Sequence, residues 1–311
     1  MTEAELEAAV GLAIADRIRV VNHGATDTVR LGVTSAGTPV EIFRPLTEVD
    51  VRICPGNLES HYFAGFTGGN KAIFPGCASK ATITAYHAMM FHPQATAGRI
   101  EGNPVRADLE EGVALLGVDF ILNVVLDPNR RIVDAFAGDA IAAHRKGCEW
   151  IKERGMISIP KRANIILASA GGYPKDINLY QAHKGLDNAC YFVREGGVII
   201  LVAECKEGFG NQIFEEWMTE GTTSKNLISR IQREFVLGGH KAAAFATVLE
   251  RTKVYLLSDL PPEVVRRCGM VSIENPGEML ERVFKEVGRG ADVLVLPQAC
   301  AIQPITCSGR K

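Results

Sequence analysis

The sequence lacks the features that mark membrane, secreted and nucleic-acid-binding proteins. No apolar run reaches the length of a membrane span, and the N-terminus has neither the basic region nor the apolar core of a secretory signal. No run of basic residues is present, and the net charge of −2 argues against a surface for polyanions. We therefore expect neither a membrane nor a nucleic acid among its partners.

Cysteine patterns typical of metal sites or redox motifs are also missing, because the eight cysteines form no Cys-x-x-Cys pair. They are Cys54, Cys77, Cys148, Cys190, Cys205, Cys268, Cys300 and Cys307. Scattered cysteines in a chain of 311 residues predict reduced, mostly buried thiols, and hence a cytoplasmic protein.

The length and composition are those of a globular protein with two domains: 311 residues, 47% hydrophobic and 23% charged. The first half mixes short strand-like runs with helices, whereas from Ala163 onward apolar strands alternate with helices. This alternation predicts a parallel sheet covered on both faces. We predict an α/β fold with two α/β domains, residues 1–158 and 159–311, and an active site in the cleft between them.

Local patterns predict the elements of both domains. In the first we expect a helix from residue 2 with a Thr2–Glu5 capping box, strands in 17–23, 29–35, 38–44 and 49–56, a helix over 79–91, a hairpin over 120–139 that turns at 127–130, and a helix over 140–154. In the second we expect strands in 163–169, 198–204, 254–259 and 292–299, and a helix over 178–193 before a stop at Gly196 and Gly197.

The segment 60–93 concentrates chemistry, with three of the seven histidines around the loop "GFTGGNK". Thr67, Gly68 and Gly69 can present backbone N–H groups to an anion, although the loop matches neither the P-loop nor the dinucleotide fingerprint. A tight turn between packed elements explains the same glycines equally simply. The loop alone therefore leaves phosphate binding open.

The lysine and histidines of this segment also allow two readings each. Lys71 suits a phosphate contact or a nucleophilic amine, but also a solvated surface position. His87, in the middle of the predicted helix, suits a buried structural histidine or a metal ligand, and His61 suits a general base or a structural role. His92 lies where it would cap the end of a helix.

A second group of polar residues follows the strand 163–169. Gly171 and Gly172 lead into a helix whose first turns carry Tyr180, Gln181 and Lys184. Open α/β sheets bind ligands beyond the carboxyl ends of their strands, and an amide with an ammonium suits a small hydroxy acid. A solvated helix start remains the alternative.

Three segments together resemble the nickel-pincer lactate racemase family: "HYFAGFTGGNKAIFPG", "SKATITAYH" and "GGYPKDINLYQAHK". The resemblance extends over essentially the whole chain. It implies a racemase or epimerase of a 2-hydroxy acid, with a pyridinium mononucleotide that carries nickel on two sulfurs and one ring carbon. Cofactor-synthesis proteins are then partners.

The resemblance also implies roles for individual residues. Lys71 matches the lysine that holds the cofactor covalently, His87 the nickel ligand, and His61 one of two catalytic histidines. Thr67, Gly68 and Gly69 would hold the nucleotide, and Tyr180, Gln181 and Lys184 would line the substrate site. Inversion would proceed by removal and return of a hydride, which avoids a carbanion beside a carboxylate.

Two departures from the family pattern bear on activity. The sequence starts after the point where family members carry a His-Arg-Pro motif with the second catalytic histidine, so we expect a truncated chain with impaired racemisation. Asn70 stands where many members have a basic residue, which puts cofactor contacts in doubt. The alternatives are a non-catalytic fragment of the same fold and a phosphate-handling α/β transferase.

Overall fold

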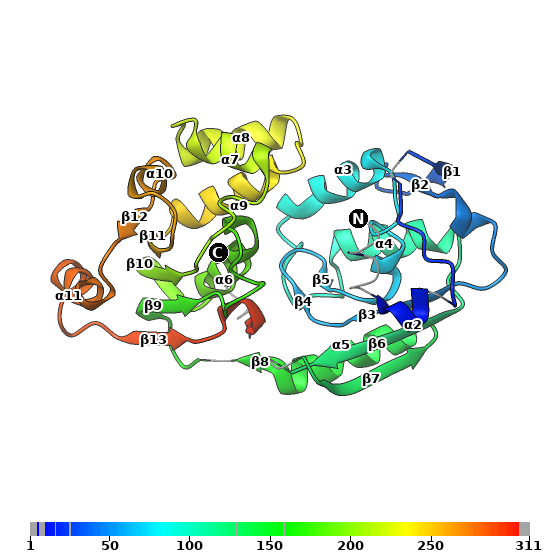
Figure 1. Cartoon of the computed structure of the whole chain (residues 1–311), viewed down its shortest axis with the longest axis horizontal. Helices are drawn as coiled ribbons and strands as arrows, with labels where there is room; N and C mark the ends of the chain where they lie inside the picture. The colour runs from blue at the N-terminus through cyan, green and yellow to red at the C-terminus, as the bar shows by residue number, and fades with distance from the viewer. Residues whose placement is uncertain are drawn as a thin grey trace.

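The computed structural model describes residues 5, 10–15, 17–24, 26–127, 130–157 and 159–304. Its chain forms two lobes, each with its own sheet, joined by a thin connection at β8 (Figure 1). The predicted domain boundary falls at residue 158, which lies outside the described residues. No helix in the described part of the chain is long and apolar enough to cross a membrane.

The C-terminal lobe is built on a five-stranded sheet in the order β12-β11-β10-β9-β13, with every pair parallel. The strands are β9 (Ala163–Ser169), β10 (Val193–Val202), β11 (Lys253–Leu257), β12 (Val271–Ile273) and β13 (Val293–Leu296). The helices are α6 (Leu179–Cys190), α7 (Gln212–Thr219), α8 (Ser224–Arg233), α9 (Gly239–Leu249), α10 (Pro262–Arg267) and α11 (Pro276–Val287), with the 3-10 turn η4 (Ala299–Ala301).

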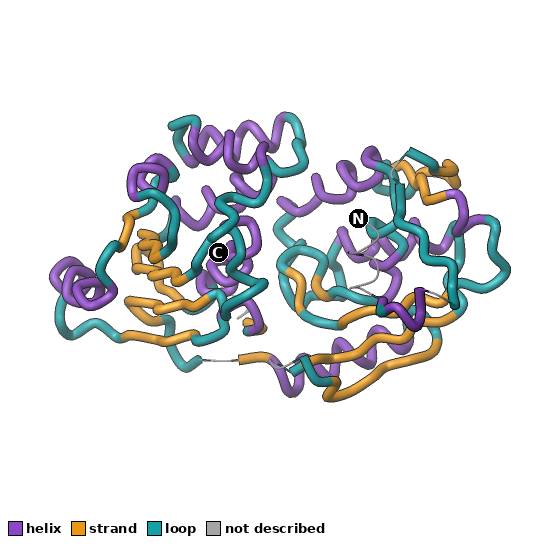
Figure 2. Tube along the Cα trace, in the orientation of Figure 1, coloured by secondary structure: helices purple, strands orange, loops and turns teal. Residues whose placement is uncertain are grey.

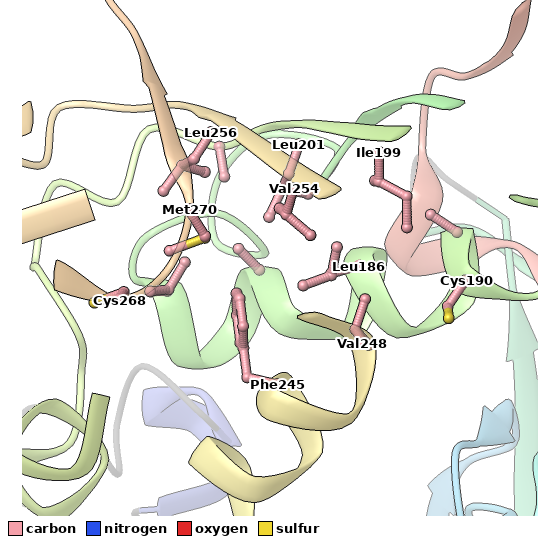
Figure 3. Packing of buried hydrophobic residues seen from close by; sticks show 14 of the residues in the cluster. Leu186, Cys190, Ile199, Leu201, Phe245, Val248, Val254, Leu256, Cys268 and Met270 are labelled. Carbon is pink, nitrogen blue, oxygen red and sulfur yellow. The ribbon is translucent and has the colours of Figure 1, made fainter. Parts of the chain in front are cut away.

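Burial on both faces explains the apolar strands of this sheet. Ile166 and Ile199 face a core that includes α6 and α9, while Ile165 and Ile200 face a second core with α11. Figure 3 shows Leu186 of α6 and Phe245 of α9 packed beneath strand residues such as Leu201. The predicted parallel sheet, covered on both faces, is confirmed.

The N-terminal lobe carries the mixed sheet β3-β6-β7 and two small antiparallel pairs, β1-β2 and β4-β5. Its strands are β1 (Thr28–Val33), β2 (Pro39–Phe43), β3 (Ile53–Asn57), β4 (Ser60–His61), β5 (Gly65–Phe66), β6 (Phe120–Leu126) and β7 (Ile132–Gly138). Its helices are α2 (Leu12–Ala15), α3 (Lys80–Ala88), α4 (Pro104–Ala114) and α5 (Ala142–Gly155), with the 3-10 turns η1 (Arg44–Thr47), η2 (Gly69–Ala72) and η3 (Met89–Phe91).

Two short strands lie at the connection between the lobes. The chain leaves the N-terminal lobe through β8 (Met156–Ile157), and β14 (Gln303–Pro304), which follows β13, pairs with β8 in parallel. Figure 2 shows strand at this connection, between the helices and sheets of the two lobes. The two lobes are therefore joined by paired backbone as well as by the chain itself.

Several predicted elements are confirmed, among them the α3 helix, whose N-cap Ser79 accepts from the Thr82 N–H, and the β6-β7 hairpin. The predicted turn of the hairpin includes residues 128 and 129, and the predicted start of the first helix falls within residues 1–4; all of these lie outside the described residues. The expected strand over 17–23 is wrong, because the described residues there pair with no strand and Ile18 and Val21 are exposed.

Two expectations for the C-terminal lobe also need correction. The helix α6 ends at Cys190 instead of continuing to 193. The strand β10 already begins at Val193, and Gly196 and Gly197 lie inside it where the register against β9 shifts. Gly196 has a φ of +69°, so the glycine pair forms a bulge in the strand and not a stop before it.

Candidate active site

The loop after β5 takes a path that only glycine allows at two positions. Gly68 and Gly69 have φ values of +72° and +57°. A Cβ on Gly68 would lie 2.6 Å from Oδ1 of Asn123, and one on Gly69 would lie 2.8 Å from Cδ2 of His144. This path places Lys71 in the short turn η2, directly after the loop.

Protein contacts already occupy several polar groups of the loop that were predicted to bind an anion. The Gly69 N–H donates to Oδ1 of Asn123 at 2.7 Å. The Thr67 hydroxyl donates to the Asn57 carbonyl at 2.8 Å, and the Thr67 carbonyl lies 2.9 Å from Nε2 of His144. These contacts favour the interpretation in which Thr67 and Gly69 form a tight turn over the interpretation in which they bind an anion. The buried Asn70 side-chain oxygen, in contrast, has no hydrogen-bond partner among the described residues.

Arg106, on α4, supports the loop from beneath and is 1% exposed. Its guanidinium donates to the Ala64 carbonyl at 3.0 Å and to the Phe66 carbonyl. Beside the larger effect of burial, its charge also lowers the pKa of Lys71 and that of His61. Arg106 therefore fixes the backbone around the site and makes its potential positive. Sequence analysis missed this residue because arginine in a helix is usually exposed.

Lys71 is a half-buried amine with an unusual proton affinity. Burial first, then the charges of Arg106 and of Lys184 in the other lobe, lower its pKa from 10.5 to about 8, against an opposing effect of Glu59. A substantial fraction of this amine is neutral near pH 8, whereas an ordinary lysine amine is almost entirely charged. Neutral amine is the form that attacks an electrophile, so Lys71 suits a covalent attachment point.

His87, on α3, is oriented by its own helix. Its Nδ1 lies 2.7 Å from the Ile83 carbonyl, which makes Nδ1 the protonated nitrogen and leaves a lone pair on Nε2. Burial, with smaller effects from Lys71 and Lys241, lowers its pKa to about 4, so the ring is neutral. A metal-ligating histidine is usually a neutral imidazole in which one nitrogen binds the metal and the N–H of the other donates a hydrogen bond, often to a carbonyl.

The described residues contain no cluster of three or more histidine, cysteine, aspartate or glutamate side chains that could hold a metal.

His61, on β4, lies against Tyr62 and Phe63, with ring centroids 4.9 and 4.6 Å apart. Burial and the charges of Lys71 and Lys241 hold its pKa well below 6.5, so the ring is neutral. The Ala64 N–H donates to its Nδ1 at 3.3 Å, which favours a proton on Nε2. In this tautomer Nε2 is a donor and Nδ1 holds the lone pair, so the ring can accept a proton only after the hydrogen bond from Ala64 to Nδ1 is lost.

The predicted residues of the C-terminal lobe lie at the start of α6. Asn178 caps this helix, and its side chain accepts from the Gln181 N–H at 3.0 Å. Tyr180 and Gln181 are half-buried and Lys184 is exposed. The charge of Lys184 lowers the pKa of Lys71 across the interface, so the two lysines share one electrostatic environment.

Two residues of α9 that sequence analysis missed complete the interface. The Lys241 ammonium lies 4.8 Å from the Tyr62 ring centroid and 5.0 Å from that of Tyr180. The ring of His240 lies 5.6 Å from that of His87. The sequence offered one sign of them, because "GGHK" at 238–241 repeats the Gly-Gly-x-Lys pattern of "GGNK" at 68–71.

Residues from both lobes thus converge on one region. His61 and His87 flank Phe63, while Lys241 joins Tyr62 of one lobe to Tyr180 of the other. Cavities lined by both lobes lie beside this region; one, of about 280 Å³, is bounded by residues that include Tyr62, Phe63 and Asp187. Among the described residues, no side-chain hydrogen bond joins Gln181 to this group.

Comparison with known proteins matches both lobes of the chain to one family. Residues 1–98 match the family model described as the lactate racemase N-terminal domain, and residues 159–303 match the lactate racemase C-terminal domain. The lactate racemase of Thermoanaerobacterium thermosaccharolyticum is 33% identical over 96% of this chain and 72% of its own length. That of Lactiplantibacillus plantarum is 33% identical over 97% of this chain and 73% of its own length.

Solved structures agree with the sequence comparisons. The lactate racemase apoprotein of T. thermosaccharolyticum superposes with a TM-score of 0.93 at 32% identity, over 98% of this chain and 75% of that one. A protein from Thermotoga maritima has the same fold, with a TM-score of 0.76 at 18% identity. The predicted α/β fold is confirmed.

Fold, site and matches together define an isomerase of the racemase class. The chain belongs to the lactate racemase family.

Proposed function

We propose that this protein racemises a small 2-hydroxy acid with a nickel-pincer nucleotide held covalently by Lys71. The observation that carries the proposal is the pairing of two prepared groups in one lobe: an amine with a pKa of about 8 and a neutral histidine whose Nδ1 is bound to a backbone carbonyl. The first suits the covalent attachment and the second suits the metal. When bound, the cofactor supplies an acceptor and donor for hydride.

The residues of the chain divide the remaining work between the lobes. In the N-terminal lobe, Lys71 and His87 hold the cofactor, and Asn70, with its unpartnered side-chain oxygen, is available to contact it. His61 exchanges the proton of the substrate hydroxyl. To accept that proton at Nε2, the neutral ring must carry its own proton on Nδ1, so the hydrogen bond from the Ala64 N–H to Nδ1 is lost in this step. In the C-terminal lobe, Lys184 offsets the substrate carboxylate, with Tyr180 and Gln181 beside it.

Aromatic packing around these groups explains how the site keeps water away from the reacting atoms. Phe63 contacts both His61 and His87, with centroid distances of 4.6 and 5.4 Å, and Tyr62 covers Lys241. A dry environment strengthens the pull of each charge on the substrate. It also lowers the pKa of each histidine, which keeps both rings neutral for proton exchange and for ligation.

The test is mass spectrometry of the intact protein after expression with cofactor-synthesis proteins and nickel. We expect a covalent adduct on Lys71 and about one nickel per chain. Lys71→Arg should abolish both, whereas Lys80→Arg, at an exposed position of α3, should change neither. His87→Ala should retain the adduct and lose most of the nickel. An adduct-free, nickel-free wild-type protein contradicts the proposal.

Racemisation itself is measured by chiral detection on a panel of 2-hydroxy acids. The loaded protein should equilibrate one member of the panel from either enantiomer, and His61→Asn should abolish the reaction while the adduct remains.

A further inference from the structure

Lys241 is a buried cation at the interface between the lobes. It lies on α9, is 3% exposed, and its ammonium sits between the rings of Tyr62 and Tyr180. Tyr62 follows His61 directly in the chain, so Lys241 faces the acid–base residue of the proposed reaction and not only its own lobe. Its charge lowers the pKa of both His61 and His87.

The described residues provide few interactions that would offset the buried charge of this ammonium. Its one polar contact is Nδ1 of His183 at 3.4 Å, and no carboxylate of the described residues lies within 4 Å of it. An ammonium has three donors, and among the described residues its hydrogen-bond partner is His183. Asp187 acts on Lys241 through its charge without forming an ion pair within 4 Å, and a buried cation without a direct ion-pair partner is costly and suits a ligand that supplies an anion.

The charge itself persists at neutral pH. Burial and Lys184 lower the pKa of Lys241 to about 8, while Asp187 and Cys300 act in the opposite direction. At pH 7 roughly nine in ten Lys241 side chains remain protonated. Lys184 carries a second positive charge close enough to affect the first. The C-terminal lobe therefore presents two ammonium groups to one region.

The two ammonium groups exceed what a substrate with one carboxylate requires. In the proposed function, on which this inference rests, Lys184 faces the carboxylate next to the hydroxyl. Lys71 loses its charge when it is acylated by the cofactor, so it does not compete for the substrate anion. Lys241, which contacts Tyr180 of the proposed substrate site, remains for another anionic group.

We propose that Lys241 binds a second carboxylate of the substrate, and that this chain acts on a 2-hydroxy diacid in preference to a monocarboxylate such as lactate. Two cations that act on one region discriminate by charge, because a monocarboxylate leaves the buried Lys241 without a carboxylate partner.

The experiment measures binding of malate and lactate by calorimetry at pH 7, on the full chain both without cofactor and loaded with it. Wild-type protein should bind malate at least about tenfold more tightly than lactate. Lys241→Met should reduce the preference to about one by weakening malate alone, and Lys184→Met should weaken both acids. Lys225→Met, at an exposed position of α8, is the matched control and should change neither.

Each other outcome overturns the inference. Equal binding of the two acids by wild type, or equal weakening of both by Lys241→Met, shows that Lys241 does not select a second carboxylate. Binding of neither acid to the loaded or unloaded protein does the same. Lys241→Gln is a second variant at the same position. Circular dichroism of Lys241→Met and Lys241→Gln shows whether either substitution causes a folding defect. Failure of the proposed function is distinguishable, because it appears as a missing adduct on Lys71 with the malate preference intact.

Discussion

The amine of Lys71 allows a quantitative test of the electrostatics at the site. Its pKa is lowered to about 8 by burial, Arg106 and Lys184. At pH 7.5 this value leaves roughly a quarter of the amine neutral, against about one part in a thousand for a lysine at 10.5. The perturbation is Lys184→Met, which removes a positive charge from an exposed position and should raise the pKa of Lys71.

The assay is competitive acetylation with a trace of reagent between pH 6 and pH 11, followed by peptide mass spectrometry of the protein made without cofactor. The midpoint for Lys71 should fall near pH 8 and move upward in Lys184→Met. Lys253 is an internal reference in the same sample, because its bond to Glu286 raises its pKa and it lies far from the site in sequence and lobe.

Two results would refute the reasoning. If Lys71 titrates together with Lys253, its burial does not desolvate the amine. If Lys184→Met leaves the Lys71 midpoint in place, the charge of the C-terminal lobe does not reach the N-terminal lobe. The second result would also remove the electrostatic link between the lobes on which the site depends.

Three further predictions concern stability. Gly69→Ala should lower the free energy of unfolding by about 1–3 kcal/mol in urea denaturation, because φ is +57° and the methyl group meets His144; Gly221→Ala, with φ of +77° and open space around it, should cost less. Asn178→Ala should cost about 1 kcal/mol through loss of the α6 cap, and an unchanged midpoint would show that the bond to Gln181 contributes nothing. Lys241→Met should stabilise the protein by up to about 3 kcal/mol at pH 7. That gain should fall between pH 8 and 10.5, because the folded pKa of Lys241 lies below the unfolded one: the full penalty applies while the amine is charged in both states, and it disappears once the unfolded amine has also lost its proton. A pH-independent difference would contradict this reasoning.

Local sequence patterns were sufficient to predict the helices and strands that depend mainly on neighbouring residues. The apolar strand 163–169 predicted β9 because burial on both faces leaves no polar position. Ser79 and Asn178 predicted helix starts because an N-cap needs only a short polar side chain and the next turn. The strand expected over 17–23 failed because β-branched residues are insufficient without a neighbouring strand to pair with.

The residues that complete the site could not be predicted in this way. Arg106 bonds carbonyl groups 40 and 42 positions earlier, and Lys241 meets Tyr62 across the interface. Both contacts arise from packing between distant segments. The roles of Lys71, His61 and His87 depended on the family resemblance, because the spacing of these residues alone did not distinguish ligands from structural residues.

The paired strands β8 and β14 determine how the two halves of the site can move. The covalent connection through β8 and the pairing of β8 with β14 lie at the same edge of the lobes. We therefore expect the lobes to separate along an arc about that edge. In the proposed assignment the covalently held cofactor belongs to one lobe and the substrate cations to the other. Opening along the arc would therefore release product from between the lobes while the cofactor stays in place for the next turnover.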